Sequence, residues 1–127
     1  MLAALYREGS RFGLAWLELS SGRFCLLEAS GDDALTSEIE RLRPAEVLTP
    51  EQRAAGALNA FLRERPSWHF DLDAASRLLC EQFQTRDLAG FGCADRPLAV
   101  RAAGCLLQYV RETQKGALPH LRGLRSE

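Results

Sequence analysis

Residues 2–28 read LAALYREGSRFGLAWLELSSGRFCLLE, and this stretch decides the fold class. It contains three mainly apolar runs, at Leu2 to Tyr6, Phe12 to Leu19 and Phe24 to Glu28. The runs are separated by Glu8-Gly9-Ser10 and Ser20-Ser21-Gly22, which are typical turn residues. Strands joined by such short turns must be antiparallel neighbours, so we predict a three-stranded meander. The middle run is almost continuously apolar, which indicates a strand covered on both faces.

After the third run, the spacing of the apolar residues changes to that of a helix. Leu35, Ile39 and Leu42 follow one another at intervals of four and three. Asp32 or Asp33 can cap the first turn of this segment. We therefore predict an amphipathic surface helix that ends before Pro44.

Strands and helices then alternate along the chain. We predict a short buried strand at Ala45 to Leu48, a helix from Glu51 to about Arg65, a strand at Trp68 to Phe70 and a helix from Ala74 to Phe83. Asp71 or Asp73 would cap the last of these helices. Right-handed crossovers would place the later strands parallel to the first in one mixed sheet. The predicted fold class is therefore α/β, with a ribonuclease H-like mixed sheet of three antiparallel strands followed by alternating helices and parallel strands.

Residues 85–97 interrupt this alternation and are predicted to form a linker, because they are polar and include Gly90-Phe91-Gly92. The following helix, Leu98 to Lys115, has apolar residues on nearly all sides, which is typical of a buried helix. A single small sheet is not expected to bury it, so we predict a separate C-terminal helix whose partner is missing. Residues 116–127 have no clear periodicity and look truncated.

The composition favours a globular domain without broad attraction to nucleic acid. The chain has 127 residues, of which 26% are charged, with a net charge of −1. No apolar run approaches the roughly 18 residues of a membrane span. The N-terminus lacks a basic leader followed by an apolar core, so we expect no signal peptide and a cytoplasmic protein.

The cysteines and histidines do not have the spacing of a metal site. Cys25, Cys80, Cys93 and Cys105 are widely scattered, and neither histidine lies near a cysteine in sequence. We therefore expect free thiols in a reducing compartment and no bound metal.

Enzymatic chemistry is not supported by the acidic or glycine-rich motifs. A metal-dependent nuclease of the ribonuclease H type needs converging carboxylates, but the middle of the first strand, residues 3–6, has none. Glu18 and Glu38 could supply only distant oxygens, and Asp71-x-Asp73 is better explained as a helix cap. Gly90-Phe91-Gly92 lacks a third glycine at dinucleotide spacing, and there is no phosphate-binding loop for ATP. We expect no cofactor and no catalytic residue.

A cluster of basic residues near the C-terminus leaves two interpretations open. It consists of Arg111, Lys115, His120, Arg122 and Arg125. A solvated helix end is the simpler interpretation, and a phosphate contact in a DNA-binding domain is the alternative.

Three stretches resemble the bacterial MutS mismatch-repair family. They are RFGLAWLELSSGRF at 11–24, CEQFQTRDLAGFG at 80–92, and AAGCLLQYVRETQ at 102–114 followed by LPHLR at 118–122. They occur in the family's order and span nearly the whole chain. The resemblance implies that residues 1–90 are the connector domain and that residues 91–127 are the linker and first helix of the following core or lever domain.

The resemblance also implies a function in contact with proteins. In the family, mismatch reading and ATP hydrolysis belong to other domains, so DNA would be reached only through the parent protein. The connector would join those regions, relay their rearrangements and offer a docking surface for MutL. The family places MutL contacts around Arg77 and Leu78 on the helix from Ala74, where some relatives carry glutamines.

Overall fold

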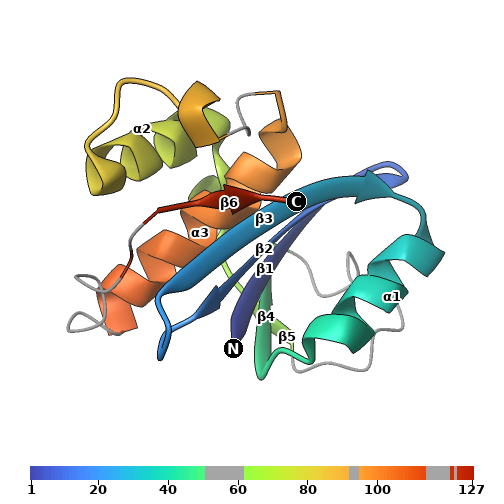
Figure 1. Cartoon of the computed structure of the whole chain (residues 1–127). Helices are drawn as coiled ribbons and strands as arrows, with labels where there is room; N and C mark the ends of the chain where they lie inside the picture. The colour runs from blue at the N-terminus through green and yellow to red at the C-terminus, as the bar shows by residue number, and fades with distance from the viewer. Residues whose placement is uncertain (51–61, 92–94, 114–120, 122) are drawn as a thin grey trace.

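One mixed sheet of six strands organises the computed structural model, which describes residues 1–50, 62–91, 95–113, 121 and 123–127 (Figure 1). The strands are β1 (Leu2–Glu8), β2 (Arg11–Glu18), β3 (Arg23–Ser30), β4 (Glu46–Thr49), β5 (Leu62–Glu64) and β6 (Arg125–Ser126), and their order across the sheet is β5-β4-β1-β2-β3-β6. The first three form the predicted antiparallel meander. β4 runs parallel to β1, β5 parallel to β4, and β6 parallel to β3. The prediction of a mixed α/β sheet is confirmed.

The helix α1 (Asp32–Leu42) covers one face of the sheet, where Leu35 and Ile39 pack into a cluster with Trp16. The helix ends as predicted, with Arg43 in the left-handed conformation just before Pro44. Its start differs from the prediction, because the cap residue is Gly31 and no side chain caps the first turn. Asp32 and Asp33 lie within that turn, where their negative charges interact favourably with the positive end of the helix dipole.

The other face of the sheet is covered by α3 (Pro97–Thr113), and α2 (Leu72–Phe83) packs against α3 (Figure 1). α3 contacts β1, β2 and β3 as well as α2, so its apolar residues are buried on nearly all sides within this chain. The prediction of a separate helix with a missing partner is therefore wrong. The sheet covers one side of α3, and α2 covers another.

Two elements before α2 also differ from the predictions. Leu62–Glu64 form a parallel edge strand on β4, where a helix was expected to continue to about Arg65. The rest of that predicted helix, residues 51–61, lies outside the described residues. The expected strand at Trp68 to Phe70 is a 3-10 turn, η2 (Ser67–Phe70), in which Phe70 is buried and Trp68 is exposed. Because β5 already occupies the edge of β4, this turn serves to insert Phe70 into the core.

The segment predicted as a linker contributes to the core in the part that the structure describes. Leu88 is buried, and a short 3-10 turn, η3 (Ala89–Phe91), places the ring of Phe91 5.5 Å from that of Phe83. In the described part of the tail, Leu124 is buried and β6 pairs with β3. No helix in the described ranges has the length and hydropathy needed to cross a membrane.

Candidate protein-interaction surface

The helix α2 is fixed at its N-terminus and along its inner side. The Asp71 side chain accepts a hydrogen bond from the backbone N–H of Ala74 at 2.9 Å, which confirms the predicted cap. Ala75 and Leu79 are buried against the core. A Cβ on Gly104 of α3 would lie 2.3 Å from the Cβ of Ala75, so small residues allow the two helices to approach closely. The position of α2 is therefore set by close packing on α3.

Arg77 and Leu78, the residues expected to contact MutL, differ in their exposure. Arg77 is exposed, on the side of α2 opposite Leu79, and it has no ion pair with any described residue. Leu78 is half-buried and packs against the main core cluster. Of the two residues, Arg77 is thus the one whose side chain is available to a partner.

A pocket of about 380 Å³ lies beside Arg77, between α2, the segment after it and the start of α3. Its lining includes Leu72, Asp73, Ser76, Arg77, Cys80, Arg86, Asp87, Leu88, Pro97 and Val100. Partial burial and the neighbouring Asp87 carboxylate raise the pKa of the Cys80 thiol. No local residue pattern marks this pocket in the sequence, because its walls come from three separate segments.

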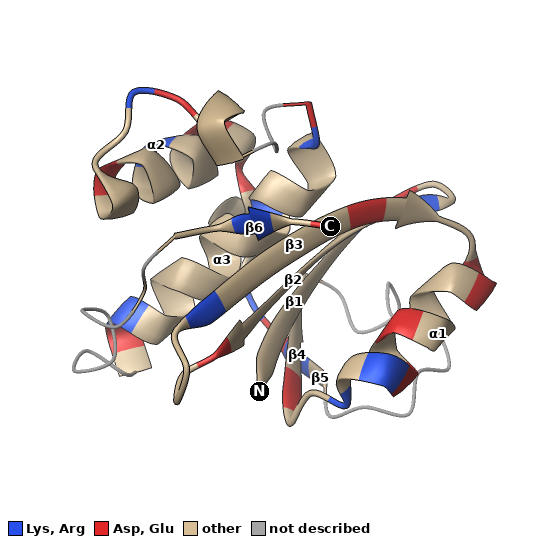
Figure 2. Cartoon of the chain, viewed as in Figure 1, with Lys and Arg blue, Asp and Glu red and all other residues tan. Residues whose placement is uncertain are grey.

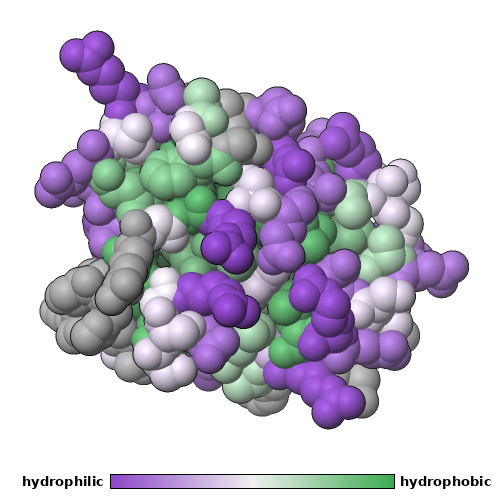
Figure 3. Space-filling view, in the orientation of Figure 1, coloured by the Kyte–Doolittle hydropathy of each residue, from purple (hydrophilic) through white to green (hydrophobic). Residues whose placement is uncertain are grey.

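The far end of α2 is held by aromatic and polar contacts. Phe83 packs against the rings of Phe24 and Phe91, with centroid distances of 6.2 and 5.5 Å. Arg111 of α3 donates a hydrogen bond to the Gln82 side chain at 3.1 Å. In Figure 3, hydrophobic residues are visible between the positions of α2 and β6, framed by hydrophilic residues.

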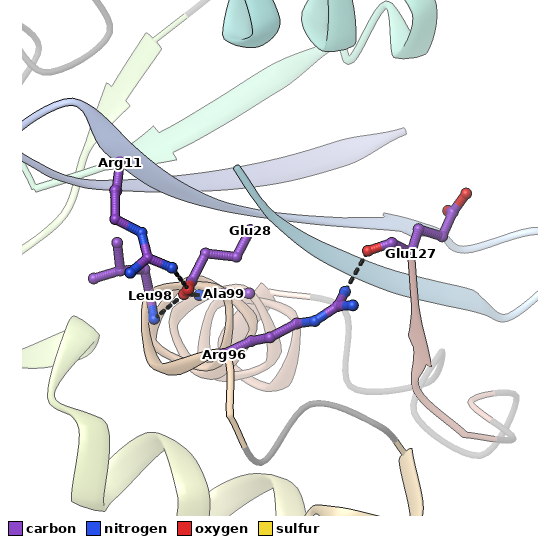
Figure 4. A network of polar contacts seen from close by, with 6 residues as sticks. All are labelled: Arg11, Glu28, Arg96, Leu98, Ala99 and Glu127. Atoms are coloured by element: carbon purple, nitrogen blue, oxygen red, sulfur yellow. Dashed lines mark hydrogen bonds and ion pairs between the residues drawn. The ribbon is translucent and has the colours of Figure 1, made fainter. Parts of the chain in front are cut away.

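Glu28 joins the sheet to the first turn of α3 (Figure 4). Its side chain is only 3% exposed, and it accepts hydrogen bonds from the backbone N–H groups of Leu98 at 2.7 Å and Ala99 at 3.3 Å. Arg11 forms an ion pair with the same carboxylate at 2.5 Å. A carboxylate at a helix N-terminus accepts hydrogen bonds from N–H groups that have no partner within the helix. Its negative charge also interacts favourably with the positive end of the helix dipole. Any movement of α3 relative to β3 would have to break this contact.

A second polar cluster, which was not predicted from the sequence, lies near the other end of α3. Arg65 forms an ion pair with Glu112 at 2.9 Å and lies over the ring of Tyr109 at 5.3 Å. Burial and the nearby Arg65 charge lower the pKa of His69. Arg65 and Glu112 are 47 residues apart in the chain, so no sequence spacing could have paired them.

The residues considered for nuclease chemistry lie apart from one another. Glu18 is at the end of β2, and Glu38 lies on α1, where it pairs with Arg41 at 2.5 Å. Within the described part of the chain, no three His, Cys, Asp or Glu side chains gather closely enough to hold a metal ion.

The basic residues near the C-terminus are only partly described. Arg111 contacts Gln82, and Arg125 is exposed on β6. The other three, Lys115, His120 and Arg122, lie outside the described residues. Figure 2 shows acidic and basic residues interspersed over the described elements of both helical layers and the sheet.

Comparison with protein families identifies the arrangement. A family model described as MutS domain II matches residues 1–122, which is nearly the whole chain and includes α3. The match covers strands β1 to β5 of the sheet, the close contact between α2 and α3, and the Glu28 contact at the start of α3. The chain therefore belongs to the MutS domain II family, the connector domain of the mismatch-repair protein MutS.

Proposed function

We propose that this connector domain recruits MutL through the outer face of α2. The observation that carries the proposal is the exposed Arg77, which has no ion pair among the described residues, on a helix whose inner side is fixed by Ala75 and Leu79. A rigid helix limits the backbone entropy that is lost on binding, so that mainly the Arg77 side chain has to be ordered. Leu78, at the edge of this face, would contribute a smaller apolar contact.

The test is Arg77→Glu in the full-length MutS protein that carries this domain. We expect MutL recruitment to mismatch-bound MutS to weaken by about tenfold, because charge reversal at an interface both removes an attraction and adds a repulsion. Mismatch binding should be unchanged. Arg43→Glu is the matched control, since Arg43 is exposed next to α1 on the opposite face of the sheet. Recruitment that is equal in the Arg77 variant and the control would contradict the proposal.

We further propose that α3 relays rearrangements between α2 and the rest of MutS. Support comes from its contacts with three strands on one side and α2 on another, and from the Glu28 contact at its first turn. Hydrogen exchange of full-length MutS should show protection changing together in α2 and α3 when nucleotide or mismatched DNA binds. Changes elsewhere, with none in these two helices, would contradict a relay through α3.

The sheet is inferred to be of the ribonuclease H-like class, without its catalytic activity. The order β5-β4-β1-β2-β3, with antiparallel pairs among the first three strands and parallel pairs at β4 and β5, supports the class. The lack of an acid in the middle of β1 and the engagement of Glu38 by Arg41 support a non-catalytic role. Cleavage of an RNA–DNA hybrid with Mg²⁺ or Mn²⁺ would contradict it. The proposed setting is the cytoplasm, with ATP hydrolysis supplied by another domain of MutS.

A further inference from the structure

His69 lies on the turn η2, which joins β5 to α2 and packs on both α2 and α3. Its two neighbours in the turn differ in environment, since Phe70 is buried and Trp68 is exposed. The His69 ring is half-buried, with Arg65 Nη2 3.4 Å from its Nδ1 and Gln108 Nε2 of α3 3.5 Å from its Nε2. The imidazole therefore occupies the contact between the turn and α3.

The position of Arg65 determines which form of the imidazole fits this contact. A guanidinium can only donate hydrogen bonds, so the Nδ1 atom that it faces has to be the unprotonated nitrogen of a neutral ring. The proton of that ring is then on Nε2, where the side-chain oxygen of Gln108 can accept it after a half-turn of the amide. A protonated ring would present both an N–H and a positive charge to the guanidinium. The contact is thus matched to neutral His69.

Arg65 cannot easily move away from a charged ring, because it is held from three directions. Its backbone N–H donates to the carbonyl oxygen of Thr49 at 2.9 Å, its side chain pairs with Glu112, and its guanidinium lies over the ring of Tyr109. The Arg65 side chain is also only 21% exposed, so solvent and salt screen its charge weakly. Repulsion between the two cations would therefore be relieved by movement of His69, which lies on a single short turn.

The charges that act on His69 among the described residues are those of Arg65 and Glu112. Burial and the Arg65 charge lower the pKa of His69, and the Glu112 carboxylate opposes them only in part. Glu112 is already paired with Arg65 at 2.9 Å, and its side chain is 49% exposed. It therefore does not cancel the repulsion that a protonated ring would meet.

The other ionisable groups around η2 have contacts of their own or face solvent. Arg101 of α3 donates a hydrogen bond to the carbonyl oxygen of Phe70 at 3.3 Å, and the Asp71 carboxylate caps α2. Burial raises the pKa of the Cys105 thiol to about 12, so that thiol is neutral in acid. Glu64 is exposed on β5. The remaining charged side chains of α2 are also exposed: Asp73, Arg77 and Glu81.

We propose that His69 is a pH-sensitive latch, which holds η2 on α3 while its ring is neutral and releases the turn when the ring is protonated. Because the pKa is lower in the folded chain than the ordinary 6.5, the contribution of His69 to stability is complete above pH 6.5. It is lost as the pH falls through the folded value. Phe70 stays buried as the anchor of the turn, so release loosens η2 without opening the core.

Hydrogen exchange of the 127-residue chain across a pH series tests the release. The N–H groups of His69 and Asp71 donate to carbonyl oxygens of the turn at 3.0 and 3.3 Å, so their protection factors report whether the turn is intact. From about pH 8 to about pH 5, above the ordinary range of carboxylates, we expect this protection to fall severalfold. The N–H of Arg43, which closes the last turn of α1, should keep its protection. In His69→Gln, whose side chain cannot be charged, the turn should stay protected throughout.

Proton NMR of the imidazoles provides the second measurement, and it remains informative if His69→Gln does not fold. The chain has two histidines, so the signal of His69 can be assigned by its shift in variants of its neighbours. Its midpoint should lie below 6.5, rise in Arg65→Gln and fall further in Glu112→Gln. Glu40→Gln is the matched control, because Glu40 is an exposed glutamate on α1, and it should leave the midpoint unchanged.

The outcomes decide the proposal in either direction. Loss of protection near the His69 midpoint in the wild-type chain, with none in His69→Gln, supports the latch. An equal loss in both chains, a turn that stays protected down to about pH 5, or a midpoint that does not rise in Arg65→Gln overturns it.

Discussion

Gly13 and Glu28 are cross-strand partners in the β2–β3 pair, and both contact the first turn of α3. A Cβ on Gly13 would lie 2.0 Å from the carbonyl carbon of Leu98 and 2.2 Å from the backbone nitrogen of Ala99. Glu28 accepts hydrogen bonds from the N–H groups of the same two residues. One partner thus allows the helix to approach the sheet, and the other stabilises it there.

Gly13→Ala should destabilise the domain strongly. The added methyl group would meet backbone atoms, which can move only if the whole start of α3 moves. We expect the free energy of unfolding in urea to fall by about 3 kcal/mol or more. Gly90→Ala is the matched control, because a Cβ there meets nothing within 4 Å, and it should change stability by less than about 1 kcal/mol. Equal losses in the two variants would contradict this account of Gly13.

Glu28→Ala should also lower stability, through a different mechanism. The substitution leaves the N–H groups of Leu98 and Ala99 without their acceptor and removes the partner of Arg11. Hydrogen bonds to a charged group contribute about 1.5–3 kcal/mol, and we expect a loss of that order in urea denaturation. Glu8→Ala, at an exposed glutamate of β1, provides the comparison and should have little effect. A Glu28 variant as stable as the Glu8 variant would show that the cap is unimportant.

Cys105 should make the domain less stable at alkaline pH. Burial raises the pKa of its thiol from an ordinary 9.0 to about 12 in the folded chain. Below pH 9 the Cys105 thiol is neutral in both the folded and the unfolded states, so its contribution to the free energy of unfolding does not change with pH. Between pH 9 and about 12 the unfolded state loses its proton first, and stability falls as pH rises.

The check is urea denaturation of wild-type and Cys105→Ala chains between pH 8 and about 10.5, a range that spans the ordinary thiol pKa. The alkaline decline should be smaller in the variant, which lacks the thiol, and identical declines would rule out this source. In native protein, Cys105 should also react with iodoacetamide far more slowly than Cys80, which is only partly buried.

Asp71→Ala should loosen the start of α2. The substitution removes the acceptor for the backbone N–H of Ala74, and loss of such a cap costs about 1 kcal/mol. Hydrogen exchange should accelerate in the first turn of α2 more than in α3. Asp71→Asn or Asp71→Ser should restore most of the protection, since both side chains can cap a helix. Failure of both to do so would indicate that the cap has another role.

The first four strands, the cap of α2 and the mixed α/β class of the sheet could be predicted because each depends on local residue patterns. The turns after β1 and β2 contain Gly9 and Gly22, both with positive φ, and these glycines are visible in the sequence. Asp71 stands directly before a helical period. The start of α1 shows the limit of such patterns. Asp32 and Asp33 were expected to cap this helix but lie in its first turn, a position to which acidic residues are equally suited.

The position of α3 could not be predicted from its own residues. Apolar side chains on nearly all sides indicated burial correctly, but not what covers the helix. Gly13 is the one local sign of where α3 lies, because a glycine within an apolar strand often marks the close approach of another backbone. The pocket beside Arg77 is even harder to predict from the sequence, since its lining depends on how α2, residues 86–88 and α3 pack together.

The contact between Glu28 and Leu98 has a consequence for how the chain folds. The two residues are 70 positions apart, and α3 covers strands that precede it by a similar distance. Non-local contacts of this kind slow folding, because a long loop must close before they form. During synthesis, the apolar face of the N-terminal meander that α3 covers stays exposed until α3 has been synthesised. In that interval it can aggregate or bind chaperones. The first strands of this domain are thus made early and completed late.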